Sequence, residues 1–229
     1  PPSIEENYTV LETPASTEAT KSLDVQRFLS LLAKLAKHHM AGGVGQGTEA
    51  EVAAGLFSWG LDFHVARAPG RLDVMGGISD YSGSRVLQMP TAEACVVALQ
   101  KQPESRSVRV LSFGATAGGR APLFEMPLGE LLGPDGKPKP LAELQAKLAA
   151  DPSTAWAAYV VGTLAVLMHE EGVRFRSGMN FIVRSDVPEG KGVSSSAALE
   201  VASMMAVLAA HPATAVSPPE RVAVRAEGA

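Results

Sequence analysis

The sequence predicts an α+β fold, because segments typical of strands and segments typical of helices occupy separate blocks and do not alternate regularly. Residues 63–128 contain runs of β-branched and apolar residues separated by turns rich in Gly, Ser and Pro. Residues 141–210 contain three helix-forming segments around one further strand-like run. With 229 residues, 46% of them hydrophobic, and no internal repeat, the chain suits one domain with a sizeable core.

The first predicted element is an amphipathic helix over residues 22–40, with Ser22 or Asp24 as its N-cap. Its apolar residues recur at helical spacing and form one face that we expect to be buried: Val25, Phe28, Leu29, Leu32, Leu35 and Ala36. Residues 1–20 are rich in Pro, Glu, Ser and Thr without a usable period, which predicts a linker.

Five predicted strands and three predicted helices follow. The strands are residues 63–69, 85–100, 107–113, 122–128 and 178–188, with loops at 70–84, 114–121 and 133–140. The helices are residues 141–150, 153–172 and 194–210. They end at Asp151-Pro152, Gly172 and His211-Pro212, because Gly and Pro interrupt helices.

The charge pattern argues against nucleic-acid and membrane-surface binding. The formal net charge is -4, and Lys and Arg are scattered, whereas both functions need a basic patch. Cys95 is the only cysteine, so we expect a reducing, cytoplasmic environment, and its apolar surroundings predict a buried, inert thiol. The chain begins at Pro1 and stops within an apparent helix, so we expect a fragment of a longer polypeptide.

The strongest candidate for a binding site is the stretch VPEGKGVSSSAALE. Its first part, residues 187–196, is called the Gly-Ser loop below. Glycines let the backbone approach an anion closely, and the free N–H groups of the following helix attract phosphate. The P-loop pattern fails because Ser185 replaces its first glycine, and the dinucleotide pattern fails at Ser195. Taken alone, the stretch equally fits a turn in which Ser194 caps the helix.

Two further stretches indicate a family. ARAPGRLDVMGGISDYSG resembles the galactokinase substrate motif G-R-V-N-L-I-G-E-H-T-D-Y, and WAAYVVG matches the galactokinase pattern W-x-x-Y-x-x-G. With PEGKGVSSSA downstream, which resembles P-x-x-x-G-L-S-S-S-A, the chain is similar to the GHMP small-molecule kinases. The resemblance implies a ribosomal protein S5 domain 2-like N-terminal domain over residues 56–229, incomplete at its end. Residues 1–55 would be a preceding linker and helix.

The resemblance also implies roles for individual residues. Arg71 would be catalytic, and the sugar would be bound by Gly77, Ile78, Asp80 and Tyr81. The residues implied to bind ATP are Pro188, Gly190, Lys191, Gly192, Val193, Ser194, Ser195, Ser196, Trp156 and Tyr159, and Ser196 would also bind Mg²⁺. The alternatives are that Trp156 and Tyr159 are ordinary core residues, and that Arg71 and Asp80 are a surface Arg and an Asx-turn.

The departures from galactokinase suggest the sugar. Gly77 and Ile78 replace a Glu-His pair that lies toward the C6 hydroxymethyl group, and a site without polar partners there disfavours that hydroxyl. The chain is similar to plant and algal L-arabinokinases, which implies phosphorylation of L-arabinose and fusion to an N-terminal glycosyltransferase-like region. Galactose, glucuronate and a non-catalytic binding role remain alternatives. The family's M-D-Q segment is absent from residues 1–229, so we expect this chain alone to be inactive.

Overall fold

The computed structural model describes residues 8–10, 21–42, 48–211 and 222–226, with backbone alone for residues 8–10, 80, 81 and 222–226. A seven-stranded mixed sheet in the order β1-β7-β2-β3-β6-β4-β5 forms the middle layer. Its strands are β1 (Tyr8–Val10), β2 (Phe63–Met75), β3 (Leu87–Gln102), β4 (Ser107–Phe113), β5 (Leu123–Pro127), β6 (Gly178–Ser185) and β7 (Val222–Ala226). All pairs are antiparallel except β4 with β6, which is parallel.

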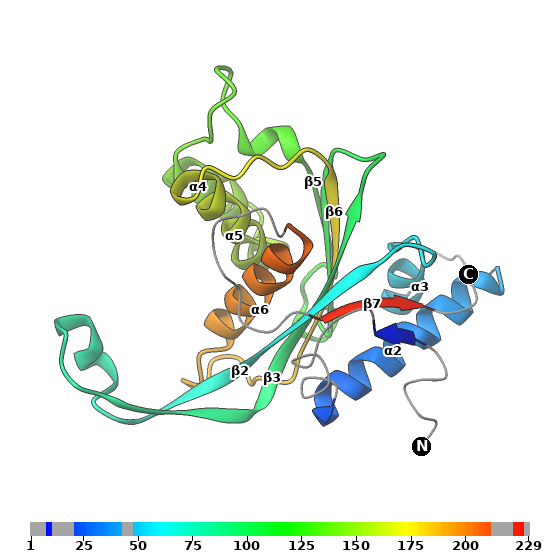
Figure 1. The fold of residues 1–229 in the computed structure, drawn as a ribbon. Coiled ribbons are helices and arrows are strands. Elements are labelled where there is room, and N and C mark those ends of the chain that lie inside the picture. Colours follow the sequence, from blue (N-terminus) through cyan, green and yellow to red (C-terminus); the bar gives the residue numbers. More distant parts are fainter. Residues whose placement is uncertain (1–7, 11–20, 43–47, 212–221, 227–229) are drawn as a thin grey trace.

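Helices cover both faces of this sheet (Figure 1). α4 (Leu141–Ala149), α5 (Ala158–Glu170) and α6 (Ser195–Ala210) lie on one side, and α2 (Leu23–Met40) and α3 (Glu49–Ala54) lie on the other. Residues of β2 and β3 alternate between the two cores, as the period of two in a strand requires. The α+β prediction is confirmed.

α2 packs as the sequence pattern predicts. Its six predicted apolar residues are all buried, together with Phe63 and Val65 of β2. Ser22 occupies the N-cap position, but its side chain makes no capping bond; Asp24 instead accepts from Val25 N (2.8 Å) and pairs with Arg67 Nε (2.6 Å). The predicted domain limit at residue 55 stays a prediction. α2 lies before this limit but shares one core with the sheet.

Two predictions on local structure are wrong, and one helix was missed. Residues 70–75, predicted as loop, continue strand β2, because their backbone pairs with β3 and their apolar and polar residues alternate as in a strand. Residues 8–10, predicted as linker, form β1 against β7, while the rest of residues 1–20 lies outside the described residues. α3 was not predicted, although Thr48 and Glu51 form a capping box before it, with Thr48 N donating to Glu51 Oε2 over 2.8 Å.

Replacing Phe28 by Ala should lower the free energy of unfolding by about 3–5 kcal/mol, because the ring is fully buried between α2 and the sheet. Urea unfolding followed by circular dichroism measures the change. Lys34→Ala is the control on the exposed face of the same helix and should change stability by less than about 0.5 kcal/mol. Equal effects of the two substitutions would show that α2 does not pack on the sheet.

Candidate active site

The Gly-Ser loop connects β6 to α6 through an unusual backbone. Gly190 (φ 67°), Gly192 (φ 73°) and Ser194 (φ 58°) all have left-handed conformations. Ser194 is the one residue other than Gly with a positive φ among the described residues. Such a conformation costs a non-Gly residue about 1–3 kcal/mol and concentrates at functional sites. The unfavourable conformation of Ser194 must therefore be stabilised by the surrounding structure.

Ser194 does not cap α6. It occupies the N-cap position, but its side chain accepts no hydrogen bond from the first turn, and its backbone lacks the extended conformation usual for a cap. Its carbonyl accepts the first helical bond from Ala198 N at 3.0 Å. The interpretation as a Ser-capped turn is therefore wrong, and the first N–H groups of α6 are not satisfied by this side chain.

A cavity of about 460 Å³ lies between the Gly-Ser loop and the start of α5; we call it the loop cavity. Five residues that the sequence predicts to bind ATP line it: Trp156, Tyr159, Gly190, Ser195 and Ser196. Pro188, Lys191, Gly192, Val193 and Ser194 belong to the loop but do not line the cavity. The sequence did not predict four polar residues in the lining: Ser112, Arg120, Ser185 and Glu189.

The two aromatic residues of the cavity differ in their surroundings. Trp156 is 7% exposed, belongs to the core, and donates from Nε1 to the carbonyl of Ala121 at 3.0 Å. Tyr159 is 42% exposed and is not part of that core. The interpretation of Trp156 as a core residue therefore holds, although Trp156 also lines the cavity. Tyr159 is available to a ligand.

Arg71 joins strand β2 to the Gly-Ser loop through its backbone. Its N–H donates to the carbonyl of Val193 at 2.9 Å. The preceding Gly70 is equally close to the loop: a Cβ there would lie 2.8 Å from Val187 Cγ1 and 2.9 Å from Val193 O. Real Cβ atoms do not approach other atoms so closely, so this contact requires glycine. The Arg-containing motif and the Gly-Ser loop thus meet in space.

The side chain of Arg71 is held by a carboxylate. Its Nε lies 3.3 Å from Asp73 Oδ1, which also accepts a 2.8 Å hydrogen bond from Gln88 Nε2. Asp73 also fills the space beside Gly77, where a Cβ would lie 3.2 Å from Asp73 Oδ2. Sequence reasoning missed Asp73, although the galactokinase motif has Asn at this position. Arg71, Asp73 and Gly77 form one small cluster.

The other predicted sugar residues lie at the end of a projecting arm. β2 and β3 continue beyond the sheet as a two-stranded β-arm, residues 71–75 and 87–93, and η2 (Gly77–Ser82) forms its tip (Figure 1). Ile78 is 85% exposed, and the side chains of Asp80 and Tyr81 lie outside what the structure describes. No described side chain of the β-arm lines the loop cavity. The backbone of Arg71 contacts the loop, but its side chain and the described residues of η2 do not line the cavity.

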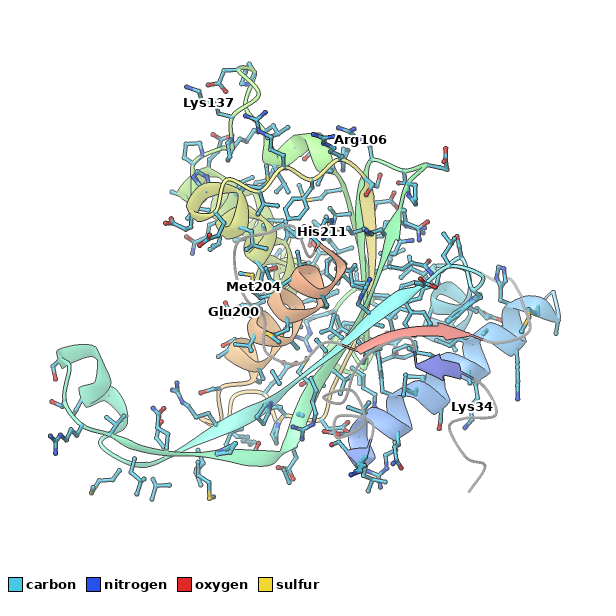
Figure 2. All side chains as sticks on the ribbon, viewed as in Figure 1. Lys34, Arg106, Lys137, Glu200, Met204 and His211 are labelled. Carbon is cyan, nitrogen blue, oxygen red and sulfur yellow. The ribbon has the colours of Figure 1, made fainter. Side chains whose placement is uncertain are left out.

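A second cavity lies beside the first, between α4, α5 and α6, and has a volume of about 590 Å³. Figure 2 labels Glu200 and Met204, which line it from α6, and Tyr159 borders both cavities. Most of its other lining residues are apolar, and burial raises the pKa of Glu200. It offers fewer polar groups than the loop cavity, which is therefore the stronger candidate for a functional site.

Cys95 behaves as predicted. It is fully buried in β3, and this burial raises the pKa of its thiol to about 12, more than the nearby Ser185 hydroxyl lowers it. A thiol with this pKa is neutral at physiological pH and is not a nucleophile. Cys95 is therefore a core residue.

Comparisons with known proteins identify related sequences. A model of the GHMP kinases N terminal domain matches residues 158–229, and a model of the galactokinase galactose-binding signature matches residues 59–101. An L-arabinokinase of Arabidopsis thaliana is 49% identical over 185 residues, which are 71% of this chain and 18% of that protein. The chain thus spans under a fifth of the length of this relative.

The fold also has a counterpart among solved structures. The crystal structure of Lactococcus lactis galactokinase complexed with galactose matches with a TM-score of 0.53 and 20% identity, over 82% of this chain and 39% of that one. At this identity the likeness concerns the fold alone, and it confirms the predicted fold class. In the described part of the chain, no helix is long and apolar enough to cross a membrane. The same residues contain no cluster of three or more His, Cys, Asp or Glu side chains suited to a metal.

Replacing Gly70 by Ala should separate β2 from the Gly-Ser loop and lower stability by about 1–3 kcal/mol, because the new methyl group would overlap the backbone of Val193. The matched control is Gly162→Ala within α5, where a Cβ meets nothing within 4 Å. This control should stabilise the protein by up to about 1 kcal/mol, since Ala favours helix. Thermal unfolding compares the two, and a neutral Gly70→Ala would contradict the close approach.

The thiol of Cys95 should resist a disulfide-forming reagent such as DTNB at pH 8 in the folded protein. With a pKa of about 12, its reactive thiolate is a fraction of about 10⁻⁴ at that pH. In denaturing urea, where the pKa returns to its ordinary value, one thiol per chain should react within minutes. Rapid labelling of folded protein with an unchanged circular dichroism spectrum would disprove the assignment.

Proposed function

We propose that the chain is the sugar- and nucleotide-binding part of a sugar kinase of the GHMP family, because residues 158–229 match the GHMP kinases N terminal domain and residues 59–101 match the galactokinase galactose-binding signature. The proposed reaction transfers the γ-phosphoryl group of ATP to the anomeric hydroxyl of L-arabinose. The observation that carries the proposal is the loop cavity, because residues 156 and 159 meet the Gly-Ser loop there. The loop in turn holds Arg71 by a backbone hydrogen bond.

The residues of the loop cavity suit ATP. Its volume lies in the range of small-molecule sites, and the start of α6 offers N–H groups to phosphate oxygens. Ser195 and Ser196 line the same end of α6 and would bind the phosphates, while Tyr159 and the edge of Trp156 would contact the adenine. Mg²⁺ takes most of its ligands from water and phosphate, so the Ser196 hydroxyl is the contribution we propose from this chain.

Arg71 would stabilise charge on the transferring phosphoryl group. Its side chain is 46% exposed, and its own backbone N–H makes the contact with the loop, so a ligand at the loop can reach it. In the reaction the anomeric oxygen bonds to the γ-phosphorus, the bond to ADP breaks, and the hydroxyl proton passes to a base. We propose that another part of the protein supplies this base, since the family's M-D-Q segment does not occur in residues 1–229.

L-arabinose is the sugar that we favour. Gly77 and Ile78 provide no polar group for a C6 hydroxymethyl, and L-arabinopyranose lacks that group. The 49% identity to an L-arabinokinase supports the same choice. The match to the galactose-binding signature favours galactose as the second candidate. The chain spans 18% of its arabinokinase relative, which accommodates the fused glycosyltransferase-like region that we expect before it.

The proposal is tested by measuring ADP release with L-arabinose, D-galactose and D-glucuronate, using protein expressed from its complete gene. We expect kcat/KM for L-arabinose to exceed that for D-galactose at least about tenfold, the effect of one unpaired polar group. Preference for D-galactose would establish the second candidate. ATP binding without ADP release from any sugar would establish a non-catalytic protein. Residues 1–229 alone should release no ADP.

Gly77→Glu should lower kcat/KM for L-arabinose about 10–100-fold, because the new side chain would meet the Asp73 carboxylate, both sterically and as a like charge. The double variant Asp73→Asn with Gly77→Glu removes the charge conflict and recreates the galactokinase pair. It should recover stability and favour D-galactose relative to the single variant. An equal loss in both variants, measured with both sugars, would show that residues 73 and 77 are not coupled.

A further inference from the structure

Two charged side chains line the loop cavity and pair with each other. Arg120 comes from the turn between β4 and β5, and Glu189 comes from the Gly-Ser loop; no other residue lining this cavity is charged. Arg120 Nη2 donates to Glu189 Oε1 at 2.9 Å. Their sequence separation is 69 residues, so the pair joins two walls of the cavity that the chain does not connect locally. The family resemblance assigned neither residue a role.

The turn that carries Arg120 is hydrogen-bonded to other residues around the cavity. Arg120 N donates to Ala115 O at 3.1 Å, and the next residue, Ala121, is bound twice. Its N–H donates to Ser153 O at 3.1 Å, and its carbonyl accepts from Trp156 Nε1 at 3.0 Å. The guanidinium also lies over Gly118, where a Cβ would be 3.3 Å from its Nε. Arg120 is thus positioned by the same turn that holds Trp156.

Glu189 creates an electrostatic problem for an anionic ligand. It immediately precedes Gly190, the first left-handed residue of the Gly-Ser loop, and its carboxylate borders the cavity proposed for the ATP phosphates. A carboxylate near a polyphosphate repels it, and the repulsion is strongest where water is partly excluded. An Arg with five N–H donors can pair with a carboxylate and still present further donors to a phosphate.

We propose that Arg120 is a positioning residue for the nucleotide. It neutralises Glu189 and fixes it against the β4–β5 turn, so the Gly-Ser loop can accept a polyphosphate without repulsion from its own carboxylate. This inference rests on the proposed function, since it presupposes that ATP occupies the loop cavity. In this proposal Arg120 contacts no reacting atom. Its loss should therefore weaken nucleotide binding more than it slows phosphoryl transfer.

The test measures the KM for ATP and kcat at saturating sugar, in protein expressed from its complete gene. Arg120→Ala should raise the KM for ATP about tenfold and change kcat less than about threefold, as expected for an uncompensated like charge at a binding site. Arg120→Lys should retain most of the affinity. The double variant with Glu189→Ala should return the KM to within about threefold of wild type, because the repelling carboxylate is then absent.

The chain offers a closely matched control in Arg109→Ala. Arg109 Nε lies 3.3 Å from Glu125 Oε2 across β4 and β5, outside the loop cavity, without hydrogen-bond geometry at that nitrogen. The side-chain exposures are similar: 32% and 51% for this pair, 30% and 63% for Arg120 and Glu189. Arg109→Ala should leave the KM for ATP unchanged. Circular dichroism of each variant separates loss of fold from loss of affinity.

Salt provides an independent readout. Added salt screens the repulsion from Glu189, because the Debye length falls about threefold as ionic strength rises from roughly 0.05 to 0.5 M. The increase in the KM for ATP caused by Arg120→Ala should therefore become smaller over this range. Equal KM values for the Arg120 and Arg109 variants would overturn the proposal. So would a double variant as impaired as Arg120→Ala. Absence of ATP binding by the wild-type protein, measured with a fluorescent ATP analogue, would instead overturn the proposed function.

Discussion

The close approach of strand β2 to the Gly-Ser loop organises the candidate site. At this point the Arg71 N–H donates to the Val193 carbonyl, and Gly70 leaves the space that Val187 and the loop backbone occupy. The contact holds the loop one residue before Ser194, whose left-handed conformation is unfavourable in isolation. A strained residue persists only where its neighbours restrict it, and this backbone bond supplies such a restriction. It also joins the backbone of Arg71 to the loop.

The sheet explains why this approach is possible. β2 and β3 pack against α6 on one face and against α2 on the other, so their backbones are fixed in the middle layer (Figure 1). β6 pairs with β3 and leads into the Gly-Ser loop. It ends at the same end of the sheet from which β2 extends as the β-arm. The loop therefore has a rigid strand before it and a buried helix after it. Precision at a binding loop generally comes from such support.

The sequence predicted those parts of the molecule that local patterns determine. The buried face of α2 follows from helical periodicity, and the β4 limits follow from one β-branched run. The end of β2 was missed because its Gly and Asp residues suggested a turn, although apolar and polar residues alternate there. The Arg120–Glu189 pair could not be foreseen, since its partners are 69 residues apart and meet only after the sheet has formed. The same holds for Arg71 and Val193.

The two halves of the proposed site differ in how they are built. The loop cavity is bounded by elements of the main core, whereas the predicted sugar residues lie on the β-arm, whose strand residues are largely exposed. On one face of this arm, Leu72 lies opposite Met89 and Met75 opposite Leu87, and all four are exposed. A two-stranded ribbon is only marginally stable by itself in water. The half proposed to bind nucleotide is thus pre-formed by packing, while the half proposed to bind sugar depends on contacts beyond the ribbon. Under the proposed function, substitutions on the β-arm such as those at Gly77 would change sugar preference without disturbing the core.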